Sequence, residues 1–301
     1  MFLKHSHVRL LIQIAETGKL QSAAEALAIS QPAASRILSD LETQAGGALF
    51  RRHPKGMEPT PVGAVFLKRA RVILSEFESL EAEIDDAKAG RAGKIRVGSV
   101  SGPTVGCLVP AIRHVKTISP KIEATIEVGT SAELFRGLQE GRFDFIIARP
   151  PPSYDTLGYR VMPARGEVVS LVVNPDHPLA HRQGLQLGDL ADYEWVVQER
   201  GSPIRTAVEQ AFHAQDLPTP ANITNSSSLL VVLAMVKHSP AIASLAHEVA
   251  ELVTQPANSD APVILKLETP ISVTPYFVMY DRNRQFSPSA ELVLQEVIAR
   301  L

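Results

Sequence analysis

Near the start of the chain, the side chains whose types could do chemistry lie on one face of a short predicted helix. In residues 20–45, LQSAAEALAISQPAASRILSDLETQA, small and apolar residues recur at helical spacing and form two stripes. Burial of the second stripe leaves five side chains facing outward: Gln31, Pro32, Ser35, Arg36 and Ser39. A Gln side chain can pair with adenine and an Arg side chain with guanine, while Pro can contact a thymine methyl group. Such a face is suited to reading base edges in the major groove of DNA.

Two short helices joined by a tight turn must position that face. Ser30 is a preferred N-cap residue, and Pro32 is tolerated in the first turn, where N–H groups have no intrahelical acceptors. Alanines at the facing positions allow the two backbones to approach closely, so the pattern predicts a helix-turn-helix. The alternative is an ordinary helical hairpin with a solvated polar face. A first helix over residues 5–17 is expected to pack behind the pair.

A basic cluster follows directly. Residues 48–61, ALFRRHPKGMEPTP, predict a two-stranded wing that places Arg51, Arg52 and Lys55 near DNA phosphates or the minor groove. Residues 1–71 contain ten Lys and Arg against five Asp and Glu, a net charge of +5, whereas the whole chain carries −2. A basic head on a near-neutral body favours a DNA-binding domain joined to a second module.

A long helix is predicted over residues 62–89, after Thr60 as its cap and Pro61 as its first residue. Its apolar residues form a seam at coiled-coil spacing, which predicts dimerisation through Phe66, Ile73, Phe77, Leu80 and Ile84. Two heads would then bind the two half-sites of a partly palindromic operator. The alternative is a helix that lies on its own domain.

The rest of the chain alternates strands and helices, which predicts an α/β fold with a parallel sheet covered on both faces. Strands are expected at residues 95–99, 122–128, 143–148, 168–173, 195–198, 241–245 and 273–280, and helices at 105–117, 132–140, 204–215, 227–237 and 289–301.

Ligands of open α/β sheets bind beyond the carboxyl ends of the strands, and this rule selects ten candidate ligand-binding residues. They are Ser99, Ser101, Thr130, Ser131, Arg149, Gln198, Arg200, Ser202, Asn225 and Ser226. As a set they are rich in hydrogen-bonding groups, which favours a sugar or sugar derivative first and a small carboxylate next. The alternative is that the Ser and Thr residues only cap helices and the Arg residues are surface charges.

The sequence contains no P-loop and no H-E-x-x-H motif, and we expect neither enzymatic activity nor a cofactor. Cys107 is the only cysteine, so there is no disulfide framework or Cys-rich metal site. The N-terminus has no signal-peptide core, and no apolar run approaches the length of a membrane span. These features predict a soluble, cytoplasmic protein.

The runs AETGKLQSAAEALAISQPAASRILSDLE, GALFRR and EPTPVG resemble the signature of LysR-type transcriptional regulators in residue identity and spacing. The resemblance is strong over residues 5–66 and holds as a pattern over the remaining chain. It implies that Gln31, Pro32, Ser35 and Arg36 contact an operator. It also implies a homodimer that assembles into a tetramer, in which closure of the effector domain on a ligand changes the spacing of the heads.

The same resemblance implies a winged helix-turn-helix at residues 1–61, a linker helix at 62–90 and a two-lobed effector domain, similar to periplasmic binding proteins, at 91–301. Lobe I would comprise about 92–163 plus 270–301, and lobe II about 164–269, with crossovers near residues 162–163 and 268–270. The ligand would lie between the lobes. One alternative is a solute-binding or interaction protein that uses its helical N-terminus as an adaptor. Another is an enzyme of porphobilinogen-deaminase-like architecture, which would attach its cofactor to Cys107.

Overall fold

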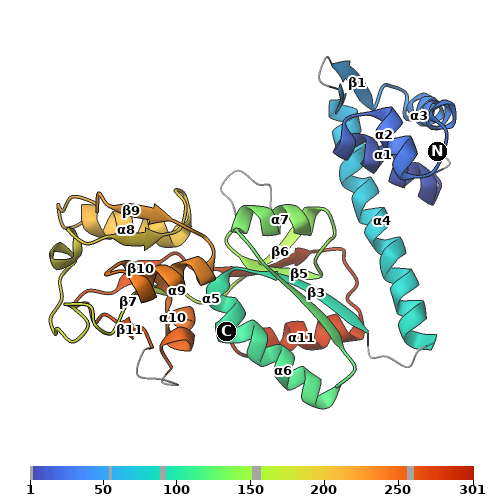
Figure 1. Ribbon diagram of the computed structural model, residues 1–301. Helices are drawn as coiled ribbons and strands as arrows, with labels where there is room; N and C mark the ends of the chain where they lie inside the picture. Colours follow the sequence, from blue (N-terminus) through green and yellow to red (C-terminus); the bar gives the residue numbers. More distant parts are fainter. Residues whose placement is uncertain (1–2, 54–55, 89–92, 151–156, 256–260) are drawn as a thin grey trace.

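The computed structural model describes residues 3–53, 56–88, 93–150, 157–255 and 261–301. A small helical head is joined by a long helix to a body made of two α/β lobes (Figure 1). The predicted fold class is therefore confirmed. No helix in the described part of the chain is long and apolar enough to cross a membrane.

The head is a helical core with a two-stranded wing. It consists of α1 (His5–Thr17), α2 (Leu20–Ala26), α3 (Gln31–Ala45), β1 (Phe50–His53) and β2 (Gly56–Pro59). Apolar side chains of all three helices form one core, which includes Leu11, Ala23, Ala34 and Leu41. These three helices and the antiparallel wing agree with the elements predicted from spacing alone.

The linker helix is α4 (Pro61–Lys88), and it starts as the sequence predicts. The Thr60 hydroxyl accepts a hydrogen bond from the backbone N–H of Gly63 at 3.0 Å, which caps the first turn. The first half of α4 belongs to the head, because Leu67 and Ala70 are buried in its core.

Lobe I is a five-stranded sheet in the order β4-β3-β5-β13-β6. The strands are β3 (Lys94–Ser99), β4 (Glu123–Val128), β5 (Phe145–Ala148), β6 (Tyr159–Pro163) and β13 (Phe277–Asp281). Its helices are α5 (Ser101–Pro103), the π-helix η1 (Thr104–Leu108), α6 (Val109–Ile118), α7 (Ser131–Gln139) and α11 (Pro288–Ile298). Side chains of β5 alternate between two cores, one under α6 and α11 and the other under α7, so both faces of the sheet are covered.

Lobe II is a second sheet, in the order β11-β7-β10-β8-β9, with β12 also paired to β7. The strands are β7 (Glu167–Val173), β8 (Trp195–Val197), β9 (Ile223–Asn225), β10 (Ile242–Ala246), β11 (Val263–Ile264) and β12 (Ile271–Val273). Its helices are the short 3-10 helix η2 (Leu187–Leu190), α8 (Pro203–His213), α9 (Leu229–His238) and α10 (His247–Thr254). Trp195 is fully buried in its core, where its indole N–H donates to the carbonyl of Leu190 at 3.0 Å.

Two predictions about the sheets were wrong. The sheets are mixed rather than parallel, because β13 runs antiparallel between β5 and β6, and β7 runs antiparallel to β10. The single strand predicted at residues 273–280 is two strands in different lobes, since β12 pairs with β7 whereas β13 pairs with β5 and β6. Pro275 lies between them and has no N–H to continue a ladder.

The lobes are joined by two crossing segments, residues 164–166 and 274–276. They are hydrogen-bonded to each other, from the N–H of Ala164 to the carbonyl of Tyr276 at 3.1 Å and from the N–H of Tyr276 to the carbonyl of Arg165 at 3.2 Å. The first crossing lies next to its predicted position, but the second follows Val273 rather than residues 268–270. Strands β6, β9 and β11 and helix α10 were not predicted from the sequence.

Candidate functional site

Helix α3 presents the predicted base-reading face to solvent. Gln31, Pro32, Ser35, Arg36 and Ser39 are all exposed, whereas the apolar residues of the other face are buried. The hydroxyl of Ser30 accepts a hydrogen bond from the N–H of Ala33 at 3.3 Å and fixes the start of the helix. The outer side of the first turns of α3, which meets base edges in a helix-turn-helix, is therefore open to solvent, while Ala34 on the inner side is buried in the head core.

The wing is held beside α3 by backbone groups. The carboxylate of Glu42 on α3 accepts hydrogen bonds from the N–H groups of Leu49 and Phe50, at 2.8 and 3.2 Å. On the wing, Arg51 is exposed and lies 3.1 Å from the carboxylate of Glu58. The side chain of Arg52 and the whole of Lys55 lie outside the described part of the structure.

The apolar seam of α4 is exposed over its second half. Ile73, Phe77, Leu80 and Ile84 are between 37 and 53% exposed, which is unusual for large apolar side chains spaced along one helix face. Phe66 differs from them, because it packs against the core of its own head.

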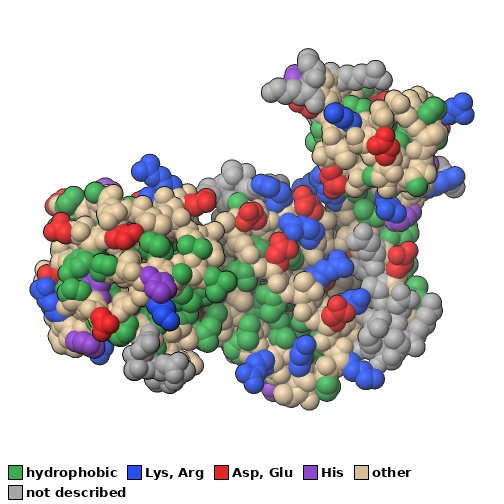
Figure 2. All heavy atoms as spheres, viewed as in Figure 1, with side chains coloured by type: hydrophobic (Ala, Val, Ile, Leu, Met, Phe, Trp, Pro, Cys, Tyr) green, Lys and Arg blue, Asp and Glu red, His purple; other side chains and the backbone are tan. Residues whose placement is uncertain are grey.

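A cavity of about 280 Å³ lies between the two lobes. Figure 2 shows hydrophobic side chains at the surface where the lobes meet. Lobe I contributes α5, η1 and the end of β4, and lobe II contributes β8, β10 and the N-terminal parts of α8, α9 and α10. The polar lining residues are Ser101, Thr104, Gln198, Ser226, Ser227 and Ser244, and the remaining lining residues, such as Val196 and Val232, are apolar. None of the residues lining this cavity is charged.

Three of the ten predicted ligand-binding residues line the cavity: Ser101, Gln198 and Ser226. The other hydroxyl residues have structural partners elsewhere. Ser99 is buried and donates to the carbonyl of Val100 at 3.0 Å, and Ser131 accepts from the N–H of Arg149 at 3.1 Å. Thr130 and Ser202 cap helices α7 and α8.

Asn225 and Arg200 also lie off the cavity lining. Arg200 is exposed, and the Asn225 side chain accepts a 2.5 Å hydrogen bond from Arg205. Arg205 is a buried residue that sequence reasoning missed. Its guanidinium also donates to the carbonyl of Gln198 at 3.2 Å and to the carboxylate of Glu209 at 2.7 Å. Arg205 therefore fixes the loop that carries Gln198 into the cavity.

Ser244 is the second residue that the sequence did not reveal. It lies on β10, is 3% exposed, and its hydroxyl lacks a hydrogen-bond partner among the described residues. A buried hydroxyl without a partner is costly, and here it lines a cavity in which a ligand could supply the missing hydrogen bond. The signal was hidden because every residue of β10 is buried, which the sequence shows only as a core strand.

Arg149 lies at the junction of the two lobes and is not free to bind a ligand. Its guanidinium lies 2.6 Å from the carboxylate of Glu167 and donates to the carbonyl of Thr274 at 2.8 Å. Burial raises the pKa of Glu167, and the positive charge of Arg149 opposes that rise. Within the described residues, no group of His, Cys, Asp and Glu side chains could hold a metal ion.

Comparison with known proteins gives matches over almost the whole chain. Residues 5–64 match the family described as "Bacterial regulatory helix-turn-helix protein, lysR family", and residues 88–301 match "LysR substrate binding domain". The transcriptional regulator GbpR of Azospirillum brasilense is 33% identical over 293 residues, which are 97% of this chain and 85% of that protein. GbpR of Rhizobium radiobacter is 36% identical over 250 residues, 82% of this chain and 83% of the relative. These proteins are regulators and not enzymes.

Solved structures share the same fold. The LysR family regulator CbnR, in complex with its target DNA, superposes with a TM-score of 0.68 at 23% identity and covers 99% of this chain and 100% of its own. Full-length OxyR from Pseudomonas aeruginosa gives a TM-score of 0.66 at 19% identity, with 99 and 95% of the two chains covered.

Proposed function

This chain belongs to the LysR family of DNA-binding transcriptional regulators, and we propose that its effector is a small neutral ligand, a sugar or sugar derivative, held between the two lobes. The observation that carries this proposal is the lining of the cavity. Six hydroxyl or amide side chains face the space together with apolar walls, and no lining residue is charged. Family membership removes both alternatives, the adaptor without DNA binding and the enzyme.

The chemistry of the lining fits a sugar better than a carboxylate. A monosaccharide offers hydroxyl groups to Ser244, Gln198 and the serines, and C–H faces to the valines of the wall. A carboxylate would require a cation or several N–H donors to replace its hydration. Arg149 cannot serve without breaking its bond to Glu167, and Arg200 does not line the cavity. The volume, about 280 Å³, also favours a ligand of monosaccharide size.

Thermal unfolding tests this proposal directly, because a ligand that binds only the folded state raises the melting temperature. We expect a neutral monosaccharide to raise it for the wild-type chain and for Ser272→Ala, an exposed serine that does not line the cavity. The same sugar should have a smaller effect on Ser244→Ala. A rise only with small carboxylates would contradict the sugar proposal and favour the second class.

DNA recognition is proposed to use the exposed face of α3, with the wing on the backbone. The five exposed residues of α3 support this assignment, and on the wing the exposed guanidinium of Arg51, paired with Glu58, is available to a phosphate. Two heads are proposed to be joined through the exposed seam of α4, and a tetramer would form from two such dimers. The variants Gln31→Ala and Arg36→Ala test the role of α3. If they lose sequence preference but still bind DNA in total as before, the role of α3 is supported. Unchanged preference in both variants would contradict it.

A further inference from the structure

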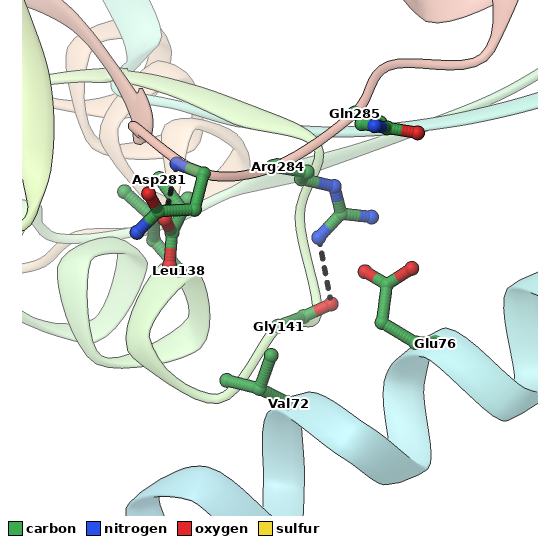
Figure 3. Close-up of a pocket in the computed structure, with 8 residues that line it drawn as sticks. Val72, Glu76, Leu138, Gly141, Asp281, Arg284 and Gln285 are labelled. Carbon is green, nitrogen blue, oxygen red and sulfur yellow. Dashed lines mark hydrogen bonds between the residues drawn. The ribbon is translucent and has the colours of Figure 1, made fainter.

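A hydrogen bond joins the linker helix to lobe I. The hydroxyl of Ser75, in the middle of α4, donates a 2.6 Å hydrogen bond to the carbonyl of Gly141. Ser75 is only 8% exposed, although it lies on a long helix outside the lobe. Figure 3 shows the turn that carries Gly141 facing α4, with the side chains of Val72 and Glu76 projecting from α4 on the side of that turn.

Hydrogen bonds hold the turn that carries Gly141 against the rest of lobe I. Arg284 donates to the carbonyls of Gly141 and Phe143, at 3.4 and 3.1 Å, and lies 2.8 Å from the carboxylate of Asp144. That carboxylate also accepts from the backbone N–H of Arg96 on β3, at 2.7 Å. The turn is thereby hydrogen-bonded to the sheet of lobe I, so a change in the position of Gly141 relative to α4 moves the lobe as a unit.

The close approach depends on a glycine. Gly141 has a φ of +76°, and a Cβ atom placed there would lie 2.9 Å from the Cβ of Ser75 and 3.1 Å from its hydroxyl oxygen. Any larger residue would push α4 away from lobe I and would also be strained by its own backbone.

The surface around the contact is mostly polar. A cavity of about 310 Å³ lies beside it, between α4 and lobe I, and Glu76 and Arg284 face each other across this space (Figure 3). Side chains lining the cavity are mostly polar, including Asp281, so separation of the two surfaces exposes little apolar area. Such an interface can exist in two states of similar free energy.

The face of α4 that carries Ser75 is opposite the apolar seam. With about 100° per residue in an α-helix, Ser75 lies roughly 200° around the helix from Ile73. Phe77, Leu80 and Ile84 lie on the same face of the helix as Ile73. One helix can therefore bind a second copy of the chain on one side and lobe I on the other at the same time.

We propose that the contact between Ser75 and Gly141 is a latch that sets the angle between lobe I and the linker helix. When this contact is formed, the effector domain and the head move as one body, and the separation of the two heads in a dimer is fixed. Open, the contact lets lobe I turn about α4 and changes that separation. The effect on the separation of the heads on DNA rests on the proposed function, whereas the latch itself does not.

The latch can be tested without DNA or ligand. Spin labels on Lys19→Cys in the head and Lys116→Cys on α6, both exposed, report the distance between head and lobe I when labelled chains are diluted with unlabelled ones. Cys107 is buried and should not be labelled. We expect one narrow distance distribution in the parent and a broad or shifted one in Gly141→Ala.

Two further variants separate the latch from general effects. Ser75→Ala removes only the hydrogen bond and should also broaden the distribution. Gly201→Ala introduces the same kind of backbone strain, at φ +87°, but its Cβ meets nothing within 4 Å, so the distribution should stay narrow. Distributions in Gly141→Ala and Ser75→Ala that match the parent would overturn the proposal.

The effect on the heads is tested with DNA. The wild-type chain first selects its preferred sequence from a random library, and the binding of each variant to that sequence is then measured. A two-base-pair insertion between half-sites rotates one of them by about 70°. We expect it to weaken wild-type binding by about tenfold, within the range of allosteric coupling, and to weaken Gly141→Ala much less. Equal losses in both chains would overturn the link to head spacing. Failure of the wild-type chain to select any sequence would overturn the proposed function, and the spin-label distances would still decide the latch.

Discussion

The guanidinium of Arg149, at the end of lobe I, lies 2.6 Å from the carboxylate of Glu167, the first residue of β7 in lobe II. The same guanidinium donates to Thr274 in the returning segment. One side chain therefore joins lobe I both to the first strand of lobe II and to the returning segment between the lobes. The Glu167 side chain is 2% exposed, so its charge has little access to water.

Replacement of Arg149 by Met should be strongly destabilising. It leaves the buried charge of Glu167 without its partner, and loss of one member of a buried ion pair costs about 3–5 kcal/mol. Urea unfolding at neutral pH would measure this loss. Arg142→Met is the matched control, because Arg142 is 44% exposed and its ion pair with Glu127 should contribute less than about 1 kcal/mol. Equal effects of the two substitutions would contradict the role of Arg149.

The stability of Arg149→Met should depend on pH. Burial raises the pKa of Glu167, so the folded state binds a proton more readily than the unfolded state. The folded state of such a group gains relative stability as the pH falls through the raised pKa, and loses it as the pH rises. Without Arg149 this pKa should rise further. The stability deficit of the variant should therefore be smaller at about pH 5 than at about pH 7, and a deficit that grows on acidification would be inconsistent with a buried, unpaired Glu167.

Arg36→Ala should relax base preference at one operator position. A bidentate contact from an exposed Arg on α3 to guanine contributes roughly 1–3 kcal/mol of discrimination. Competition binding with single-base operator variants would measure it. Arg51→Ala is the control, since a phosphate contact should weaken binding to all sequences alike and reduce the salt dependence. If Arg36→Ala behaves in the same way as Arg51→Ala, Arg36 contacts phosphate.

Leu80→Asp should separate the dimer without unfolding the chain. Leu80 is 53% exposed in the single chain, but a carboxylate in a coiled-coil seam would lose its hydration on pairing. Light scattering should give a lower mass than for the wild type. Leu252→Asp, on α10 at 52% exposure, should leave the mass unchanged. A Leu80→Asp protein of wild-type mass would refute the seam.

Cys107 should be inert in the folded protein. Burial raises the pKa of its thiol to about 11, and the thiol donates to the carbonyl of Pro103 at 3.1 Å. A thiol reagent at mildly alkaline pH should react with it only as fast as the chain unfolds, and urea should accelerate the reaction. Rapid reaction of the native protein would show that the site opens.

The head could be predicted almost completely from the sequence, because its determinants are local. Ser30, Pro32 and Thr60 start helices within one turn of their own positions, and the buried stripe of α3 follows helical spacing. The break between β12 and β13 was missed because the apolar pattern continues through both strands. Only pairing with distant strands decides which sheet each one joins.

The cavity was harder to predict, since a rule based on strand ends cannot distinguish a cap from a ligand contact. Thr130 forms a capping box with Glu133, and this hydrogen bonding lowers the pKa of the Glu133 carboxyl. Ser226, at an equivalent kind of position, lines the cavity. Ser244 shows the converse, because a polar residue inside a buried strand gives no local sign of which space it faces.

The position of β13 between β5 and β6 has a consequence for biosynthesis. The head core is complete near Leu74, whereas the sheet of lobe I lacks an internal strand until Phe277 has been made. At ordinary translation speeds this interval is roughly 10–40 s. A nascent chain thus acquires its DNA-reading head well before its sensor, with two unpaired strand edges exposed in the meantime. Premature termination before β13 would release a complete head and linker helix attached to an incomplete lobe I.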